Sequence, residues 1–174
     1  MNGDDEPASE EQSRERARRA YALGIKLLGA RDHSSAELTR KLERRDIDET
    51  AIRTALAELR AAGYVDDERY ARLFAEQLLE RGRGPMAIRA KLRERGIDGE
   101  LVADALEALG ADWVERAEAA LGSRFAPEDI VDDSQRSQAR VARFLQGRGF
   151  GAGDALRALD RARRRIELGS LVGD

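Results

Sequence analysis

The sequence predicts an all-α protein built from three tandem three-helix repeats. Three observations support this fold class: apolar residues recur at helical spacing from Tyr21 onward, one segment is repeated, and capping residues mark the same boundaries. No stretch alternates apolar and polar residues over the length of a strand, so we expect no sheet. Because 5% of the residues are aromatic and 37% are charged, small repeated cores are favoured over one thick core.

The internal repeat is the most informative of these observations. The segment SAELTRKLERRDID, which begins at Ser35, returns 50 residues later as PMAIRAKLRERGID. A looser third copy follows at a further offset of 53, so that Gly149 matches Gly96. Asp46 stands where these two copies have glycine. Self-similarity at a fixed period is typical of stacked helical units.

Capping residues place the helix boundaries. Ser34 and Glu37 have the spacing of a capping box, Asp48 and Asp98 are placed as N-caps, and Pro85 suits a first helical position. The expected helices are 17–30, 35–45, 49–62, 67–81, 85–95, 99–109, 112–125, 135–148 and 152–165.

These boundaries divide the chain into five parts. Residues 1–15 are acidic and almost free of apolar side chains, so we expect a disordered arm there. The loop at 125–134 accommodates the extra residues of the third copy. The expected parts are the arm at 1–15, repeat one at 16–63, repeat two at 64–110, repeat three at 111–166 and a C-terminal tail at 167–174.

The net charge of −3 conceals an uneven distribution, because the second helix of each repeat is basic. In repeat one, Glu37, Glu43 and Asp46 dilute the positive charge, and we expect a solvated face. In repeats two and three we expect a basic stripe that faces phosphate or an acidic protein surface, since like charges repel and need compensation. The expected partner-binding residues are Arg81, Arg83, Arg89, Lys91, Arg93, Arg95, Arg140, Arg143 and Arg148.

Residue types that catalysis and metal binding require are scarce. The chain has no cysteine, and His33 is its one histidine, so neither a thiolate site nor a histidine cluster can form. The turn at 81–85 contains glycine but lacks the Gly-Lys-Ser/Thr ending of a phosphate-binding loop. We therefore expect a non-enzyme that binds no metal or cofactor, with His33 in a loop or at a helix cap.

The sequence shows no membrane or targeting signal. Its apolar runs are far shorter than a membrane-spanning helix requires. The first twelve residues are acidic and lack the apolar core of a signal peptide. We expect a cytoplasmic protein without membrane contact.

Several segments, taken in order, closely resemble the signature motifs of the RecX family. The central motif is GYVDDERYA, which begins at Gly63, followed by RGPMAIRAKL from Arg83 and RGI from Arg95. The first-repeat motif is HSSAEL from His33, and the closing motif is RFLQGRGF from Arg143. The resemblance covers about residues 21–162 and is weakest in repeat three.

The resemblance implies an elongated, curved helical array that binds the RecA recombinase filament. It implies inhibition of RecA ATP hydrolysis and strand exchange, and thereby control of recombination and DNA repair. Tyr64 and Tyr70 belong to the central motif, but we expect them to be packing residues. Two alternatives stay open: a direct DNA-binding module, since the second and third helices resemble a helix-turn-helix, and a general helical adaptor. We expect a monomer.

Overall fold

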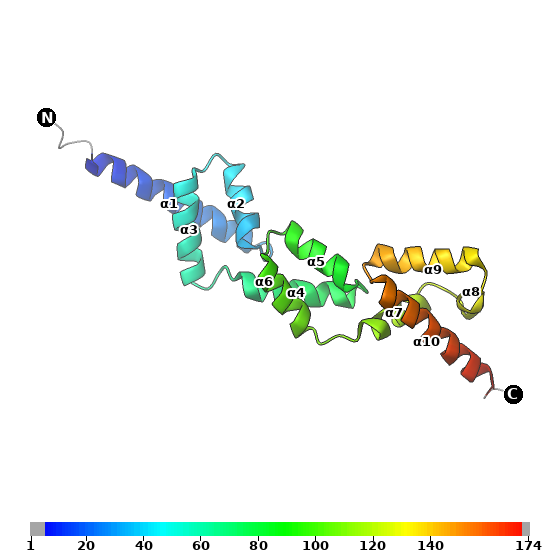
Figure 1. Ribbon diagram of the computed structural model, residues 1–174. Helices are drawn as coiled ribbons and strands as arrows, with labels where there is room; N and C mark the ends of the chain where they lie inside the picture. Colours follow the sequence, from blue (N-terminus) through cyan, green and yellow to red (C-terminus); the bar gives the residue numbers. More distant parts are fainter. Residues whose placement is uncertain (1–5, 172–174) are drawn as a thin grey trace. The chain divides into compact units, whose positions relative to one another are not determined.

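The computed structural model describes the backbone of residues 6–171, which is helical and contains no strand in that range (Figure 1). The helices are α1 (Glu6–Leu28), α2 (Ser35–Glu43), α3 (Glu49–Ala61), α4 (Asp67–Glu80), α5 (Pro85–Glu94), α6 (Gly99–Ala108), α7 (Trp113–Gly122), α8 (Pro127–Val131), α9 (Gln135–Arg148) and α10 (Ala152–Leu171). The all-α prediction is confirmed, and the boundaries of α2 to α6 and of α9 agree with the predicted ranges to within two residues.

The chain forms two compact units. The N-terminal unit comprises residues 1–71 and 93–101, and the C-terminal unit comprises residues 72–92 and 102–174. Helices α4, α5 and α6 each contribute residues to both units.

The core of the N-terminal unit joins α1, α2 and α3. Leu38 and Leu42 of α2 and Leu59 of α3 are fully buried and pack with the small Ala20 of α1. A Cβ atom at Gly24 would lie 2.7 Å from a methyl carbon of Leu59, so α1 and α3 approach closely there. Leu38 and Leu42 on α2, like Ala55 and Leu59 on α3, have the i, i+4 spacing that places residues on one buried face of a helix.

The core of the C-terminal unit is built mainly from α7 to α10. Leu121, Leu145 and Phe150 are at most 1% exposed and form one cluster with Ala158 of α10. The short helix α8 contributes Ile130 to the same cluster. Helix α8 lies where a loop was expected at 125–134, because a five-residue helix with a single buried side chain shows no apolar period.

The expected disordered arm needs correction. Helix α1 begins at Glu6, so residues 6–15 are helical, while residues 1–5 lie outside the described part. Alanine, glutamate, glutamine and arginine dominate this segment and have high intrinsic helix propensity. Glu10 and Arg14 form an i, i+4 ion pair at 3.1 Å on its exposed surface. The side chains of residues 10–15 are exposed, so no apolar pattern marks this part of the helix.

The expected C-terminal tail at 167–174 also needs correction. Helix α10 continues to Leu171, so residues 167–171 are helical, and residues 172–174 lie outside the described part. Apolar spacing ends near Ile166, which explains why the predicted helix stops too early.

The predicted caps are confirmed. The Ser34 hydroxyl accepts a hydrogen bond from the backbone N–H of Glu37 at 3.1 Å, and the Glu37 carboxylate accepts one from the Ser34 N–H at 3.4 Å. Asp48 accepts from the N–H of Ala51 at 3.0 Å, and Asp98 accepts from that of Leu101 at the same distance. These bonds satisfy N–H groups that a helix start leaves unpaired.

Three matching positions at the ends of the second helices have positive φ. Gly96 and Gly149 have φ angles of 81° and 90°, and Asp46 has a φ of 59°. Asp46 is the one non-glycine residue with positive φ in the described part of the chain. Glycine adopts this conformation without strain, and aspartate tolerates it better than most residues do.

Candidate partner-binding surface

A polar cluster in the N-terminal unit is centred on Glu37, which is 7% exposed. Its carboxylate accepts hydrogen bonds from Arg31 Nη2 at 2.9 Å and from the Tyr70 hydroxyl at 3.0 Å. Arg95 forms an ion pair with the same carboxylate. The cluster therefore ties α2 to the loop before it, to α4 and to the end of α5.

Two pKa values in this cluster are displaced. Burial alone raises the pKa of Glu37, but hydrogen bonds from Arg31, Arg95 and Tyr70 outweigh it and lower the value from 4.5 to about 2. Burial and the adjacent carboxylate raise the pKa of Tyr70 from 10.0 to about 12. At neutral pH the Glu37 carboxylate is thus charged and Tyr70 is a hydrogen-bond donor.

Arg95, an expected partner-binding residue, takes part in this packing. Besides its ion pair with Glu37, its backbone carbonyl accepts a hydrogen bond from the Ser34 hydroxyl at 2.6 Å. The neighbouring Gly96 packs on Ala36, so closely that a Cβ atom at Gly96 would lie well inside 3.0 Å of the Ala36 side chain. The end of α5 is thereby docked on the start of α2.

The same kind of junction occurs in the C-terminal unit, where the end of α9 is docked on the start of α5. The carbonyl of Arg148 accepts a hydrogen bond from the N–H of Gly84 at 2.8 Å, and that of Gly149 accepts one from Met86 at 3.0 Å. The Arg148 side chain donates to the backbone carbonyl of Arg81 at 3.0 Å. Arg148, also expected to bind a partner, therefore holds the turn before α5.

Two further expected residues lie on α9 and differ in their surroundings. Arg140 forms an ion pair with Asp129 of α8, and its guanidinium lies 5.3 Å from the ring centre of Phe125. Arg143 is exposed and donates to the carbonyl of Ala139 on its own helix at 3.2 Å. Arg140 thus has an acidic partner within the protein, whereas the charge of Arg143 is not neutralised by an ion pair among the described residues.

Helix α5 and the turn before it carry the most accessible of the expected cations. Arg81, Arg83, Arg89, Lys91 and Arg93 are all exposed. Within the described residues, the side chains of Arg83, Arg89 and Arg93 form no ion pair or hydrogen bond. Arg93 and Arg95 belong to the N-terminal unit, and the other seven expected residues belong to the C-terminal unit.

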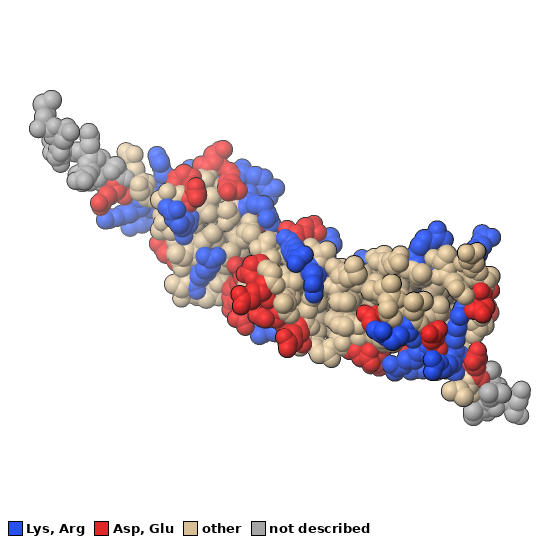
Figure 2. Space-filling view, viewed as in Figure 1, with Lys and Arg blue, Asp and Glu red and all other residues tan. Residues whose placement is uncertain are grey.

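A second basic group, which was not among the expected partner-binding residues, lies on α10. Figure 2 shows basic side chains over this helix, intermixed with acidic ones. Arg161 and Arg165 both pair with the buried Glu118, at 3.0 Å and 3.1 Å, and Arg163 pairs with Asp133 at 2.8 Å. The sequence RARRR at 161–165 was a visible signal, but these pairs give most of its charge a structural role.

The two tyrosines of the central motif have different environments. Tyr70 is 8% exposed, which confirms it as a packing residue, and it also donates to Glu37. Tyr64 is 52% exposed, so its expected packing role is wrong. Gly63 ends the preceding helix with positive φ, and the chain then presents Tyr64 to solvent.

His33 lies in the loop before α2, as expected, but it is buried. Its Nδ1 lies 2.8 Å from the carbonyl of Arg31, and a carbonyl can only accept, so Nδ1 carries the proton. Nε2 is buried and has no hydrogen-bond partner among the described residues. Burial lowers the pKa of His33 from 6.5, while the bond to Arg31 raises it by less.

We expect this histidine to remain neutral, with its proton on Nδ1, at pH values where an exposed histidine is half protonated. Because the chain has one histidine, two-dimensional NMR of the imidazole nitrogens follows it without assignment. The folded protein should give a midpoint below 6.5, and a short peptide containing HSSAEL should give the ordinary value. A midpoint at or above that of the peptide would contradict the burial of His33.

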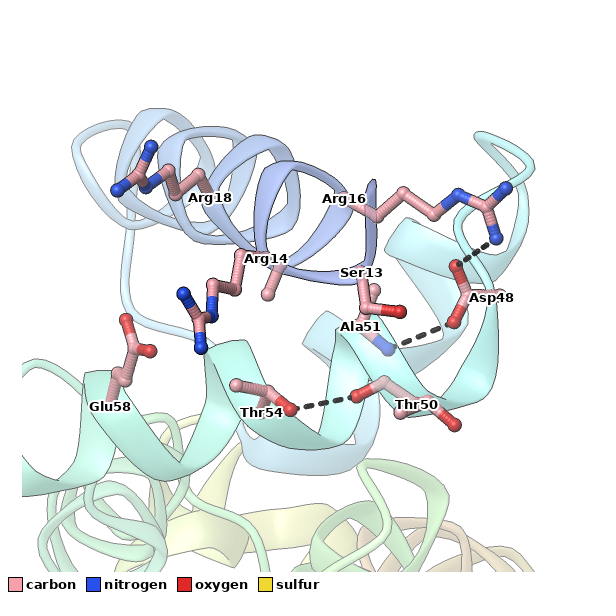
Figure 3. A pocket seen from close by; sticks show the side chains of 10 residues that line it. Ser13, Arg14, Arg16, Arg18, Asp48, Thr50, Ala51, Thr54 and Glu58 are labelled. Carbon is pink, nitrogen blue, oxygen red and sulfur yellow. Dashed lines mark hydrogen bonds and ion pairs between the residues drawn. The ribbon is translucent and has the colours of Figure 1, made fainter. Parts of the chain in front are cut away.

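A hollow lies between α1 and α3 in the N-terminal unit, with a volume of about 450 Å³ (Figure 3). Arg16 reaches Asp48 at 4.0 Å across its rim, and Asp48 also caps α3 through Ala51. Arg14 and Arg18 pair with acidic residues of their own helix. Since its three arginines are paired and exposed, the hollow lacks the convergent buried groups of a ligand site.

No group of three or more histidine, cysteine or carboxylate side chains in the described part of the chain is arranged to hold a metal ion. Within the same residues, no helix combines the length and apolar character needed to cross a membrane.

Comparison with known proteins identifies the family. Residues 20–59 match the family model for the first three-helix domain of RecX, and residues 66–106 match that for the second. Regulatory protein RecX of Stenotrophomonas maltophilia (strain R551-3) is 40% identical over 140 residues, which cover 80% of this chain and 83% of that protein. The chain belongs to the RecX family. Its regulatory role follows from this membership.

Other RecX proteins extend the match. That of Halorhodospira halophila is 37% identical over 77% of this chain and 81% of its own length. That of Xanthomonas oryzae pv. oryzae (strain MAFF 311018) is 35% identical over 90% of this chain and 96% of its own length.

Solved structures support the RecX fold. The crystal structure of RecX from Lactobacillus salivarius has a TM-score of 0.74 and 23% identity, with 88% of this chain and 98% of that chain covered. A crystal structure of another regulatory protein RecX has a TM-score of 0.76 and 22% identity, with 92% and 79% covered. At these identities the likeness shows the fold alone.

Proposed function

We propose that this protein binds the RecA filament and restrains its ATPase and strand-exchange activities by contact, without catalysis of its own. Membership of the RecX family is the observation that carries the proposal. The exposed, unpaired arginines of α5 support it, because such groups fit an acidic protein surface or exposed DNA phosphate. The site of action would be the cytoplasm, where the protein would act as a monomer.

The mechanism would rest on several weak contacts made by one chain. A chain with repeated helical units can touch neighbouring subunits of a filament, and linked contacts reinforce one another through effective concentration. Holding adjacent subunits in one geometry would impede nucleotide turnover at their interfaces. Inhibition would then need no catalytic group in this protein.

The testing experiment is the ATPase rate of RecA from the same source on single-stranded DNA, titrated with this protein. Inhibition well below the RecA concentration would support action on the filament, and near-stoichiometric inhibition would support coating of it. Binding to the DNA alone is measured in parallel. No inhibition at excess protein would rule out the proposal and favour a general helical adaptor.

Charge reversal tests the contribution of α5. We expect the double variant Arg89→Glu, Arg93→Glu to raise the concentration for half inhibition about tenfold or more, because reversed charges would repel an acidic partner. The control is Arg53→Glu, Arg164→Glu, which changes net charge equally at exposed positions on α3 and α10. Circular dichroism should show unchanged helicity in both. Equal inhibition by the two variants would exclude these two arginines from the contact.

The alternative of a direct DNA-binding module has less support. In a helix-turn-helix the second helix of the pair enters the major groove, and here that helix would be α6. Its exposed residues include Glu100, Asp104 and Glu107, which would repel phosphate. Strong, salt-dependent binding to DNA without RecA would nevertheless favour this alternative.

A further inference from the structure

Met86 lies in the first turn of α5 and is 63% exposed, one of six exposed large apolar side chains in the described part of the chain. Arg89 follows it three residues later, on the same side of the helix. Ala90, one residue further, is also exposed, so this side of α5 is apolar next to its cations.

The backbone that carries Met86 is held firmly within the C-terminal unit. Its own N–H donates to the carbonyl of Gly149 at 3.0 Å, and the N–H of Gly84 donates to that of Arg148 at 2.8 Å. The Arg148 side chain donates to the carbonyl of Arg81 at 3.0 Å. An exposed side chain on a fixed backbone loses little backbone entropy on binding, which favours affinity.

Every charged residue between Glu80 and Glu94 is positive. We call Arg81, Arg83, Met86 and Arg89 the junction surface, because they lie where the start of α5 meets the end of α9. Helix starts favour acidic residues, yet the first turn of α5 contains none. Carboxylates supplied by another molecule would compensate this excess of positive charge.

We propose that the junction surface binds an acidic protein surface, with Met86 inserted in an apolar pocket and the arginines paired with carboxylates around it. The proposal rests on the function proposed above and specifies its partner as protein and not nucleic acid. Nucleic acid bound through its phosphates alone would engage the arginines but would leave Met86 without an apolar contact. An apolar anchor within a charged rim is the usual anatomy of a protein interface, and methionine adapts well to such pockets.

The test compares Met86→Ala with Met86→Leu and with the control Leu156→Ala. Leu156 is 64% exposed and lies in the same unit on α10. Affinity for RecA filaments is measured by biolayer interferometry at low and high salt. We expect Met86→Ala to weaken binding about fivefold or more, as truncation of an interface anchor does, and the other two variants to bind like the unchanged protein.

The salt dependence of binding distinguishes the apolar contact of Met86 from the charged contacts of the arginines. The fold loss of affinity caused by Met86→Ala should be the same at both salt concentrations. The fold loss caused by Arg89→Glu should be smaller at high salt, because salt screens exposed charges. If Met86→Ala binds filaments with the same affinity as Leu156→Ala, the proposed role of the junction surface is wrong, while the proposed function of the protein stands. If Arg89→Glu weakens binding to bare DNA as strongly as to filaments, the partner is phosphate. If the unchanged protein does not bind filaments, both proposals fail.

Discussion

Replacing Gly149 with alanine is expected to destabilise the C-terminal unit by about 2–5 kcal/mol, the combined cost of left-handed backbone and of overpacking. Gly149 has a φ of 90°, which an alanine adopts only with strain. The new Cβ atom would also lie well inside 3.0 Å of the backbone nitrogen of Ala87, and the backbone there cannot move aside without disturbing the start of α5. The start of α5 would have to separate from the end of α9.

Two other glycines provide matched controls for Gly149→Ala. Gly110 has a φ of 53° with open space around it, so Gly110→Ala should show the backbone strain alone, about 1–2 kcal/mol. Gly147 lies inside α9 with open space, so Gly147→Ala should stabilise the protein by about 0.5–1 kcal/mol. Denaturant unfolding measures all three. A cost for Gly149→Ala no larger than that for Gly110→Ala would contradict close docking of α9 on α5.

The second large effect is expected at Glu37. Glu37→Gln should lower the free energy of unfolding by about 2–3 kcal/mol, because it replaces a buried charged acceptor that receives bonds from two arginines and a tyrosine. The control is Glu43→Gln on the same helix, where the side chain is exposed and a change within about 0.5 kcal/mol is expected. Equal changes in the free energy of unfolding at the two positions would show that the contacts of Glu37 stabilise the fold no more than an exposed glutamate does.

Acid should remove the contribution of Glu37. Its folded-state pKa of about 2 lies below the ordinary 4.5, so the folded state binds this proton less readily than the unfolded state does. The resulting stability is fully present above pH 4.5 and is lost as the pH falls toward 2. The difference in unfolding free energy between the unchanged protein and Glu37→Gln should therefore narrow over that window. A constant difference would show that the carboxylate charge is not its source.

Much of the fold was predictable because local chemistry and the repeat give the same boundaries. Ser34, Asp48 and Asp98 cap helices where their spacing predicts, and Leu38 and Leu42 are buried as their repeat implies. Such features depend on residues close together in the chain, which a single sequence displays directly.

Features that depend on distant partners were not predictable. Arg95 and Arg83 look alike as basic residues, yet Arg95 pairs with Glu37, 58 positions away, while Arg83 forms no such pair among the described residues. Capping spacing identified Glu37, but nothing local indicated that it would also hold Arg31 and Tyr70. The sequence therefore predicted where positive charge lies, and the structure distinguishes arginines that hold the fold from arginines that remain accessible.

Asp46 has a consequence for attempts to lengthen the protein by duplicating its units. Gly96 and Gly149 each pack against an alanine of the preceding copy, so closely that neither glycine position has room for a side chain. Asp46 occupies the matching position with both a Cβ atom and a charge. Fusing an additional copy ahead of repeat one would require Asp46→Gly, so that the end of the second helix of repeat one could pack on the new copy. A copy of repeat two inserted between repeats one and two would already have glycine at this position.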